Sequence, residues 1–221
     1  MPKMPLAVVV GLGPGLSSAL VQRFAAGGYR VVAFARSPEK SEATVAGLRA
    51  QGLSAEVRAA DAGDFTGLSR AISQAASEYG PVEVLLYNAY RATTALPSAL
   101  DPGEAVEDFK VNVAAPLAAA RAVLPSMIER RMGRIVLTGG GLALDPTGWL
   151  EAASLAIGKA GVRSLAQTLN KELVPSGVHA GTITIAGTIG DGAAFSPARI
   201  AEAYWAFVHD VSMPAELIYR G

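Results

Sequence analysis

Residues 8–17 read Val8-Val9-Val10-Gly11-Leu12-Gly13-Pro14-Gly15-Leu16-Ser17. The β-branched run predicts a buried strand, the glycines predict a tight turn, and the apolar spacing that follows predicts an amphipathic helix. Glycines are needed in such a turn because side chains would keep the backbone from approaching a pyrophosphate. The free N–H groups at the start of the helix then face that anion. An ordinary strand-to-helix turn also fits this local pattern.

The rest of the chain alternates between strand and helix, which strengthens the nucleotide-binding interpretation. Strands are predicted at 6–11, 29–35, 55–60, 82–87, 134–138, 178–185 and 216–219, and helices at 15–26, 38–51, 65–79, 102–131, 151–174 and 197–209. Pro116 and Pro125 should bend or locally break the 102–131 helix, and the glycines at 139–141 should end the strand before them. The alternation predicts one α/β domain over residues 1–221. We expect a Rossmann fold, a doubly wound parallel sheet of order 3-2-1-4-5-6-7 with helices on both faces.

The composition excludes several classes of function. The 19 Lys and Arg residues balance 19 Asp and Glu residues, so no broad basic surface is expected for nucleic acid or an anionic membrane. The chain has no cysteine, which excludes disulfides and thiolate chemistry, and His179 and His209 lack metal-ligand spacing, so we expect no metal. The apolar run near the N-terminus is too short for a signal peptide, and no stretch reaches the roughly 18 apolar residues of a membrane span. We therefore expect a cytoplasmic protein.

Polar residues follow the carboxyl ends of the second and third strands, where ligands of such sheets bind. Ala35 takes the place of the acidic residue that would accept hydrogen bonds from an adenine ribose diol, and Arg36 follows it. Arg36 can grip a 2′-phosphate, which favours NADP(H) over NAD(H); a solvated arginine is the alternative. Asp61 is placed to accept from the adenine amine, although a turn-forming aspartate explains it nearly as well.

Further features lie in a specific order along the chain. They are the glycine turn, Arg36, Asp61, Asn88-Ala89, Asn112 in Lys110-Val111-Asn112-Val113, the strand Gly133-Arg134-Ile135-Val136, and Lys159-Ala160-Gly161-Val162 with Glu172-Leu173 beyond it. Over essentially its whole length the chain resembles the short-chain dehydrogenase/reductase family. The resemblance implies an NADP(H)-dependent oxidoreductase that transfers hydride to or from a small carbonyl, alcohol or enone.

The resemblance also implies roles for single residues. Asn88-Ala89 would stabilise the central strand beside the cofactor, Asn112 would hold a helix kink and a catalytic water, and Lys159 would bind the nicotinamide ribose. The implied cofactor-binding residues are Gly11, Gly13, Pro14, Gly15, Leu16, Arg36, Asp61, Ala62, Asn88, Ala89, Lys159 and Gly187. A homodimer or homotetramer would form through the helices at 102–131 and 151–174. The alanines at 114, 115, 118, 119 and 122 permit close helix approach there, or they pack on the sheet.

The chain departs from the family at the catalytic positions. Leu155 stands four residues before Lys159, where the family has its tyrosine, and the glycines at 139–141 stand where its serine should follow the strand. Leucine has no proton to exchange, and loss of a positioned acid costs a factor of about 10²–10⁴. Smaller departures are Ser17 for the last glycine of the turn, Val10 for a threonine, and Ala186-Gly187 for Pro-Gly.

Replacement proton donors are few. Tyr87 and Tyr90 flank Asn88, and Tyr90, at the position of a family glycine, could project toward the nicotinamide or simply pack over the site. Thr138 is the nearest hydroxyl to the missing serine, whereas Ser154 points off the Lys159 face by helical geometry. Arg91 could hold an anionic substrate or be an exposed loop residue. The alternative function is a non-catalytic NADP(H)-binding sensor or scaffold, and loss of cofactor binding also stays open.

Overall fold

The computed structural model describes residues 4–190, 192–210 and 212–221. The strands are β1 (Leu6–Val10), β2 (Arg30–Ala35), β3 (Ala55–Ala59), β4 (Val82–Tyr87), β5 (Gly133–Gly140), β6 (Val178–Ile185) and β7 (Glu216–Tyr219). The α-helices are α1 (Leu16–Ala26), α2 (Glu39–Ala50), α3 (Phe65–Tyr79), α4 (Pro102–Phe109), α5 (Ala115–Arg130), α6 (Ala153–Leu173) and α7 (Pro197–His209). Most expected ranges agree with these within two residues.

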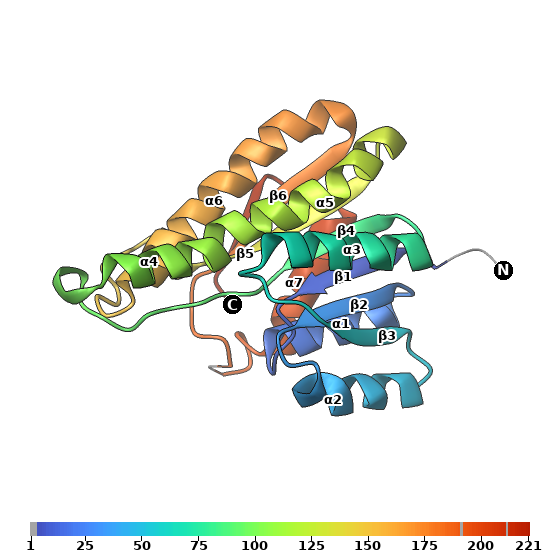
Figure 1. The fold of residues 1–221 in the computed structure, drawn as a ribbon, viewed down its shortest axis with the longest axis horizontal. Coiled ribbons are helices and arrows are strands. Elements are labelled where there is room, and N and C mark those ends of the chain that lie inside the picture. Colours follow the sequence, from blue (N-terminus) through green and yellow to red (C-terminus); the bar gives the residue numbers. More distant parts are fainter. Residues whose placement is uncertain (1–3, 191, 211) are drawn as a thin grey trace.

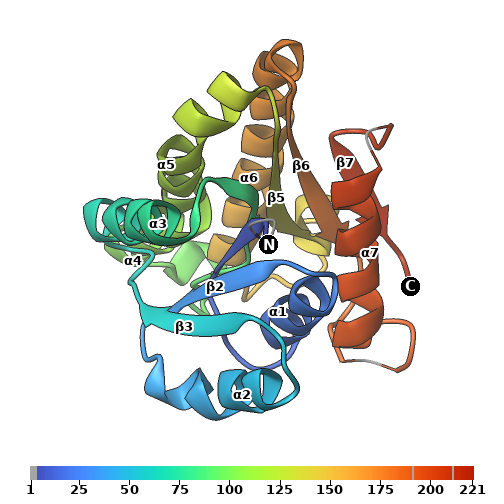
Figure 2. The same ribbon diagram turned by 90° about the vertical axis from the view of Figure 1, so that its right-hand side faces the viewer.

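The seven strands form one parallel sheet in the order β3-β2-β1-β4-β5-β6-β7, which confirms the predicted topology. Figure 1 shows β1 to β6, and Figure 2 shows β7. The first strand lies inside the sheet, beside the middle strand β4, because the chain winds outward from it in both directions. All five residues of β1 are buried, as expected for a parallel strand covered on both faces. The carboxyl ends of the central strands therefore meet at one edge, where the order reverses.

Helices cover both faces of the sheet and enclose two separate cores (Figure 2). Along β1, Leu6, Val8 and Val10 point into the core that α3, α5 and α6 cover. Ala7 and Val9 point into the other core, which α1, α2 and α7 cover. This alternation follows from the two-residue period of a strand. The single sheet with its two helical layers is a Rossmann-type α/β domain.

The segment predicted as a helix at 102–131 is one helical run rather than a broken helix. A π-helical turn at Lys110–Ala114 joins α4 to α5, Pro116 lies in the first turn of α5, and Pro125 lies within it. The prolines were expected to bend or locally break the helix; the helix runs on through Pro125, and its one irregular turn among these residues is the π turn that ends two residues before Pro116. Pro125 is exposed, and neighbouring residues hold the inner side of the helix on the sheet.

The buried side of α5 shows whether its alanines pack on the sheet or against another helix. Ala115 and Ala119 are fully buried in the core beneath α5, together with Val123 and Met127, so these alanines pack on the sheet. The run Pro102–Arg130 is 29 residues long and, by length and composition alone, apolar enough to cross a membrane. The expectation concerned about 18 successive apolar residues, which this run does not contain because charged residues such as Asp108, Lys110 and Arg121 interrupt it.

Strand β5 is longer than predicted. The glycines at 139–141 were expected to end it at Thr138, but Gly139 pairs with Thr184 and Gly140 with Ile185 of β6. A Cβ on Gly139 would lie 2.6 Å from the Thr182 hydroxyl and 2.7 Å from the Thr184 hydroxyl. Glycine is therefore part of this strand because the β6 threonines pack against its backbone, and the glycine run carries β5 two residues closer to the ligand edge.

Candidate functional site

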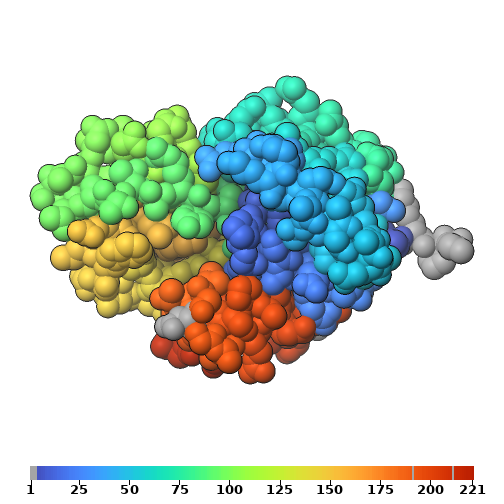
Figure 3. All heavy atoms as spheres, turned by 90° about the horizontal axis from the view of Figure 1, so that it is seen from below, coloured from blue at the N-terminus to red at the C-terminus, as the bar shows by residue number. Residues whose placement is uncertain are grey.

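Two adjoining pockets lie at the carboxyl ends of the central strands. The first, of about 340 Å³, is called the turn pocket and is lined by Val10, Gly11, Leu12, Gly13, Pro14, Ser17, Phe34, Ala35, Arg36, Ala60, Asp61, Ala62, Asn88, Ala89, Tyr90, Arg91 and Val111. The second, of about 710 Å³, is called the lysine pocket and is lined by Pro14, Gly15, Leu16, Asn88, Tyr90, Thr138, Gly139, Gly140, Gly141, Leu142, Asp145, Gly148, Trp149, Leu155, Lys159, Ile185, Gly187, Thr188 and Ile189. Pro14, Asn88 and Tyr90 border both. Figure 3 shows the surface hollowed where the blue N-terminal segment meets the green and yellow ones.

Each of the twelve cofactor-binding residues expected from the sequence lines one of these two pockets. Eight of them line the turn pocket, and the rest line the lysine pocket. Sequence positions as far apart as Gly11 and Gly187 thus share one cleft. Their roles toward a cofactor stay predictions.

The glycine turn forms an open cradle. Gly11 and Gly15 have φ angles of 92° and 85°, which side chains rarely adopt. A Cβ on Gly11 would lie 2.5 Å from the backbone of Ala89, whereas Cβ atoms on Gly13 and Gly15 would meet nothing within 4 Å. Helix α1 begins after Gly15 with no side-chain cap, so its first N–H groups are left for another acceptor. This arrangement fits the pyrophosphate of a dinucleotide.

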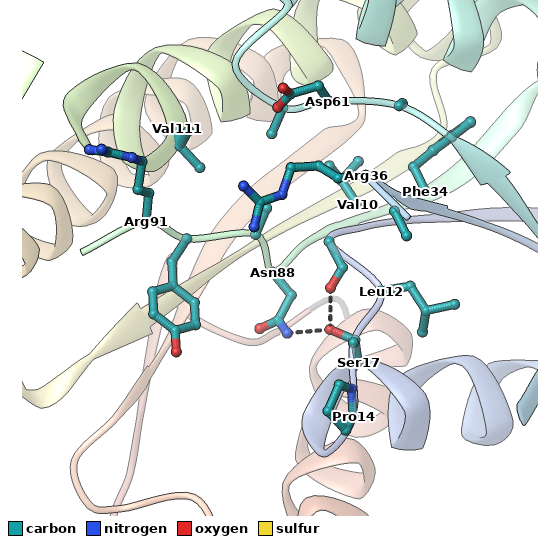
Figure 4. Close-up of a pocket in the computed structure, with 17 residues that line it drawn as sticks. Val10, Leu12, Pro14, Ser17, Phe34, Arg36, Asp61, Asn88, Arg91 and Val111 are labelled. Carbon is teal, nitrogen blue, oxygen red and sulfur yellow. Dashed lines mark hydrogen bonds between the residues drawn. The ribbon is translucent and has the colours of Figure 1, made fainter. Parts of the chain in front are cut away.

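Ser17 replaces the last glycine of the family turn without opening it. Its hydroxyl donates to the carbonyl of Gly11 over 2.6 Å and accepts from the Asn88 side-chain amide over 2.5 Å (Figure 4). The backbone N–H of Asn88 also donates to Val10. Ser17 and Asn88 together tie the end of β4 to the turn after β1.

The two polar residues beyond β2 and β3 both face the turn pocket. Arg36 is exposed, and its guanidinium extends over the pocket in the direction of Asn88 (Figure 4). No ion pair holds Arg36 among the described residues. Asp61 accepts from the backbone of Gly63 over 2.9 Å, so it does form a turn, and it also lines the pocket. A free cation at this position is suited to an anionic group on the ligand.

Lys159 projects from α6 into the lysine pocket. Its ammonium donates to the carbonyl of Thr138 over 2.9 Å and lies 6.0 Å from the centre of the Tyr90 ring. Burial lowers the pKa of Lys159 to about 8, because a desolvated ammonium is costly. No carboxylate pairs with it in the described part of the chain.

The positions of the two missing family hydroxyls lie beside this lysine. Leu155 lines the pocket one helical turn before Lys159. Among the three glycines, Gly140 is the one that faces the lysine: its Cβ would lie 3.3–3.4 Å from carbons of the Lys159 side chain. Gly139 faces the β6 threonines instead, and Gly141 faces the backbone of Ala186. At these two positions, therefore, the chain places no hydroxyl beside Lys159.

The hydroxyls of Thr138, Ser154 and Tyr87 each form a hydrogen bond away from the pocket. Thr138 shares a 2.7 Å hydrogen bond with Tyr204 beneath the sheet. Ser154 donates to the backbone of Thr93. The Tyr87 hydroxyl donates to Val111 over 2.6 Å, and burial raises the pKa of this phenol. Tyr90, by contrast, has 64% of its surface exposed and borders both pockets.

Asn112 and Arg91 serve the loop after β4 rather than the pocket centre. Asn112 lies in the π turn, accepts from the backbone N–H of Arg91 over 2.9 Å and donates to its carbonyl over 2.7 Å. The Arg91 guanidinium pairs with Glu104 and Asp108 of α4. These two carboxylates neutralise the charge of Arg91. Asn112 is not among the residues that line either pocket. The catalytic role of Asn112 stays a prediction.

No sequence pattern predicted the apolar rim of the lysine pocket. Trp149, Leu142 and Ile189 line it from the loops after β5 and β6. Trp149 is 55% exposed, and it also lines a third pocket of about 550 Å³ beside Arg36 and Leu155. An exposed tryptophan in a glycine-containing loop is the one mark that could have indicated it. Among the described residues, no three His, Asp or Glu side chains are grouped to hold a metal.

A parallel sheet of this order with an uncapped glycine turn after its central strand defines a dinucleotide-binding α/β protein. More narrowly, a model of the short chain dehydrogenase family matches residues 5–194. The chain belongs to that family of oxidoreductases.

Individual relatives are distant. A short chain dehydrogenase of Pseudocercospora fijiensis is 32% identical over 176 residues, 78% of this chain and 56% of its own length. The 2,3-dihydro-2,3-dihydroxybenzoate dehydrogenase of Bacillus subtilis is 28% identical over 83% of this chain and 69% of its own. A short-chain dehydrogenase from Rhodopseudomonas palustris superposes with a TM-score of 0.88 over all of both chains at 26% identity. A metagenomic short-chain oxidoreductase, solved in complex with NADP, superposes with a TM-score of 0.86 at 25% identity, covering 97% of this chain and 96% of its own.

Proposed function

We propose that this protein is an NADP(H)-dependent oxidoreductase acting on a small carbonyl, alcohol or enone in the cytoplasm. The observation that carries the proposal is the pair of adjoining pockets, with a glycine cradle and Arg36 at one end and Lys159 at the other. The bound nicotinamide would supply the hydride. The NADP complex of the metagenomic relative supports the choice of cofactor.

Each part of the site would bind a different part of the cofactor. The glycine turn and the N-terminus of α1 would bind the pyrophosphate, and Arg36 would bind a 2′-phosphate. Asn88 would hold the turn in shape, and Lys159 would donate to the nicotinamide ribose. The apolar rim with Trp149 would exclude water from the reacting carbon.

Calorimetric titration with NADPH and NADH tests the proposal. We expect micromolar binding that favours NADPH. Arg36→Ala should weaken NADPH binding about 10–100-fold, because it removes a charge-assisted fork to phosphate, and should change NADH binding much less. Arg70→Ala, an exposed arginine on α3, is the control and should bind both as the wild type does. Equal losses for NADPH and NADH would refute the role of Arg36.

A second candidate is a non-catalytic NADP(H) sensor or scaffold, which Leu155 and Gly140 favour because neither can polarise a substrate oxygen. The two candidates separate after binding is established. Turnover of any ketone, quinone or enone by the NADPH complex supports the enzyme, whereas tight binding without turnover supports the sensor.

A further inference from the structure

Lys159 is half-buried, and its amine has fewer partners than a cation largely removed from water normally needs. It can donate three hydrogen bonds, yet the carbonyl of Thr138 is its one acceptor among the described residues. Buried charges are normally paired. The two remaining N–H groups are available to the lysine pocket that this side chain lines.

The space beside the amine is open to a substrate oxygen. Gly140 carries no side chain between β5 and the lysine, and Leu155 places only methyl groups one turn before it. A serine and a tyrosine at these positions would separate a substrate from the lysine. Here Gly140 and Leu155 place no polar side-chain atom between a substrate and the Lys159 amine.

The other charged groups around Lys159 have partners of their own, so Lys159 is the cation available to donate a proton in the pocket. Asp145 lines the same pocket but accepts from the Thr147 hydroxyl over 2.6 Å. On the same helix, Arg163 is paired with Glu216 of β7. Three hydroxyls also line the pocket: Thr138 is hydrogen-bonded to Tyr204, Thr188 lies in the loop after β6, and Tyr90 is largely exposed.

We propose that Lys159 itself is the general acid and base of this protein, in direct contact with the substrate oxygen. The inference rests on the proposed function. In reduction, hydride from NADPH reaches the carbonyl carbon while a Lys159 N–H bond breaks and a new O–H bond forms. The products are the alcohol, NADP⁺ and a neutral amine, which solvent then reprotonates. Alcohol oxidation runs through the same atoms in reverse.

The depressed pKa of Lys159, about 8, suits this task, because an ideal acid–base group titrates near the working pH. An ordinary lysine would stay protonated and could act in one direction only.

Proton release on cofactor binding tests the proposal without a substrate. Calorimetry of NADP⁺ and NADPH binding in two buffers of different ionisation enthalpy gives the number of protons released. Near pH 8, NADP⁺ should release about half a proton more than NADPH, because a group at its pKa is half protonated and a cationic ring displaces that proton. Lys159→Arg should remove this difference in proton release between NADP⁺ and NADPH, while Tyr90→Phe and Lys171→Met should keep it.

Turnover gives the second readout, with NADPH and cyclohexenone, acetophenone and phenanthrenequinone as probes. Lys159→Arg should bind NADPH within about 10-fold of the wild type yet lower kcat by about 10² or more; Lys171→Met, at the exposed far end of α6, should leave kcat unchanged. The proposal is overturned if Lys159→Arg keeps the proton release or the turnover, if Tyr90→Phe abolishes the proton release, or if the wild type reduces none of the probes. Failure of the wild type to bind either cofactor would refute the proposed function as well. NADPH binding by the wild type, with proton release or turnover that Lys159→Arg leaves unchanged, refutes this inference alone.

Discussion

At the scale of single residues, Gly139 and Gly140 are neighbours with opposite surroundings. Gly139 lies against the β6 threonines, with hydroxyl oxygens 2.6 and 2.7 Å from the position of a Cβ, while Gly140 faces the flexible Lys159 side chain at 3.3–3.4 Å. Gly139→Ala should therefore lower the free energy of unfolding by about 1–3 kcal/mol through overpacking. Gly140→Ala should change it by less than about 1 kcal/mol. Urea unfolding of the pair measures this, and equal losses would contradict the assigned directions.

Burial of Lys159 should lower stability at neutral pH. Its folded pKa of about 8 lies below the ordinary value of 10.5, so between these pH values the unfolded chain holds more protons and stability rises with pH. Since each pKa unit corresponds to about 1.4 kcal/mol, the full penalty below pH 8 is up to about 3 kcal/mol. Lys159→Met should thus unfold at higher urea than the wild type at pH 7, with a smaller gap at pH 10. A wild type whose stability is flat from pH 8 to 10 would contradict the burial of this charge.

At the scale of elements, the loop after β4 is fixed by α4 and the π turn. Asp108, with a 1% exposed side chain, pairs with Arg91 and accepts from the backbone N–H of Thr93 over 2.7 Å. Burial acts to raise the pKa of Asp108, but hydrogen bonds from Ser154 and Thr93 and the charge of Arg91 together hold it below its usual value. This network sets the path of the loop that carries Asn88 and Tyr90 into the site.

Asp108→Asn should lower the free energy of unfolding by about 1–3 kcal/mol at pH 7, because it leaves the Arg91 charge partly unpaired. The ionised carboxyl contributes above the unfolded pKa near 3.9, and that contribution is lost as the pH falls through the lower folded pKa. The variant and the wild type should therefore converge toward pH 3. Unfolding by urea at pH 7 and pH 3 measures this, with Glu107→Gln, an exposed carboxylate on α4, as the control. A gap that is independent of pH would contradict the charge-based explanation.

Elements with a strong local pattern could be predicted from the sequence, and those that depend on a partner could not. The ranges of α3, β4, β6, α7 and β7 follow from apolar periodicity and clear stop signals. The extension of β5 through Gly139 depends on β6 threonines some forty residues later, which no local pattern contains. The same applies to Pro125, whose helix is held by packing on the sheet.

The candidate site divides in the same way. The glycine turn, Arg36 and Lys159 are located by their order after predicted strands, since carboxyl ends of parallel strands share an edge. Trp149 and the orientation of Thr138 toward Tyr204 depend on loop paths and on α7, so sequence could not assign them.

At the scale of the whole molecule, the outward side of α4, α5 and α6 is unusually apolar. Val106, Phe109, Leu117 and Ile157 are each 39–57% exposed on these three helices, and α6 packs beside the π turn and α4. Exposed apolar patches on soluble proteins mark interaction surfaces. We therefore propose that two copies associate through this surface, as the family resemblance implies.

Light scattering coupled to size-exclusion chromatography should find a dimer or tetramer at micromolar concentration. Leu117→Glu with Ile157→Glu should shift the protein to the monomer, because a buried unpaired carboxylate at each copy opposes association. Met132→Glu, an equally exposed apolar residue beyond the end of α5, should leave the oligomer intact and controls for added charge. A monomeric wild type, or dissociation by Met132→Glu alone, would contradict the assigned surface. Since α6 also carries Lys159, dissociation should loosen NADPH binding through the helix that joins interface and site.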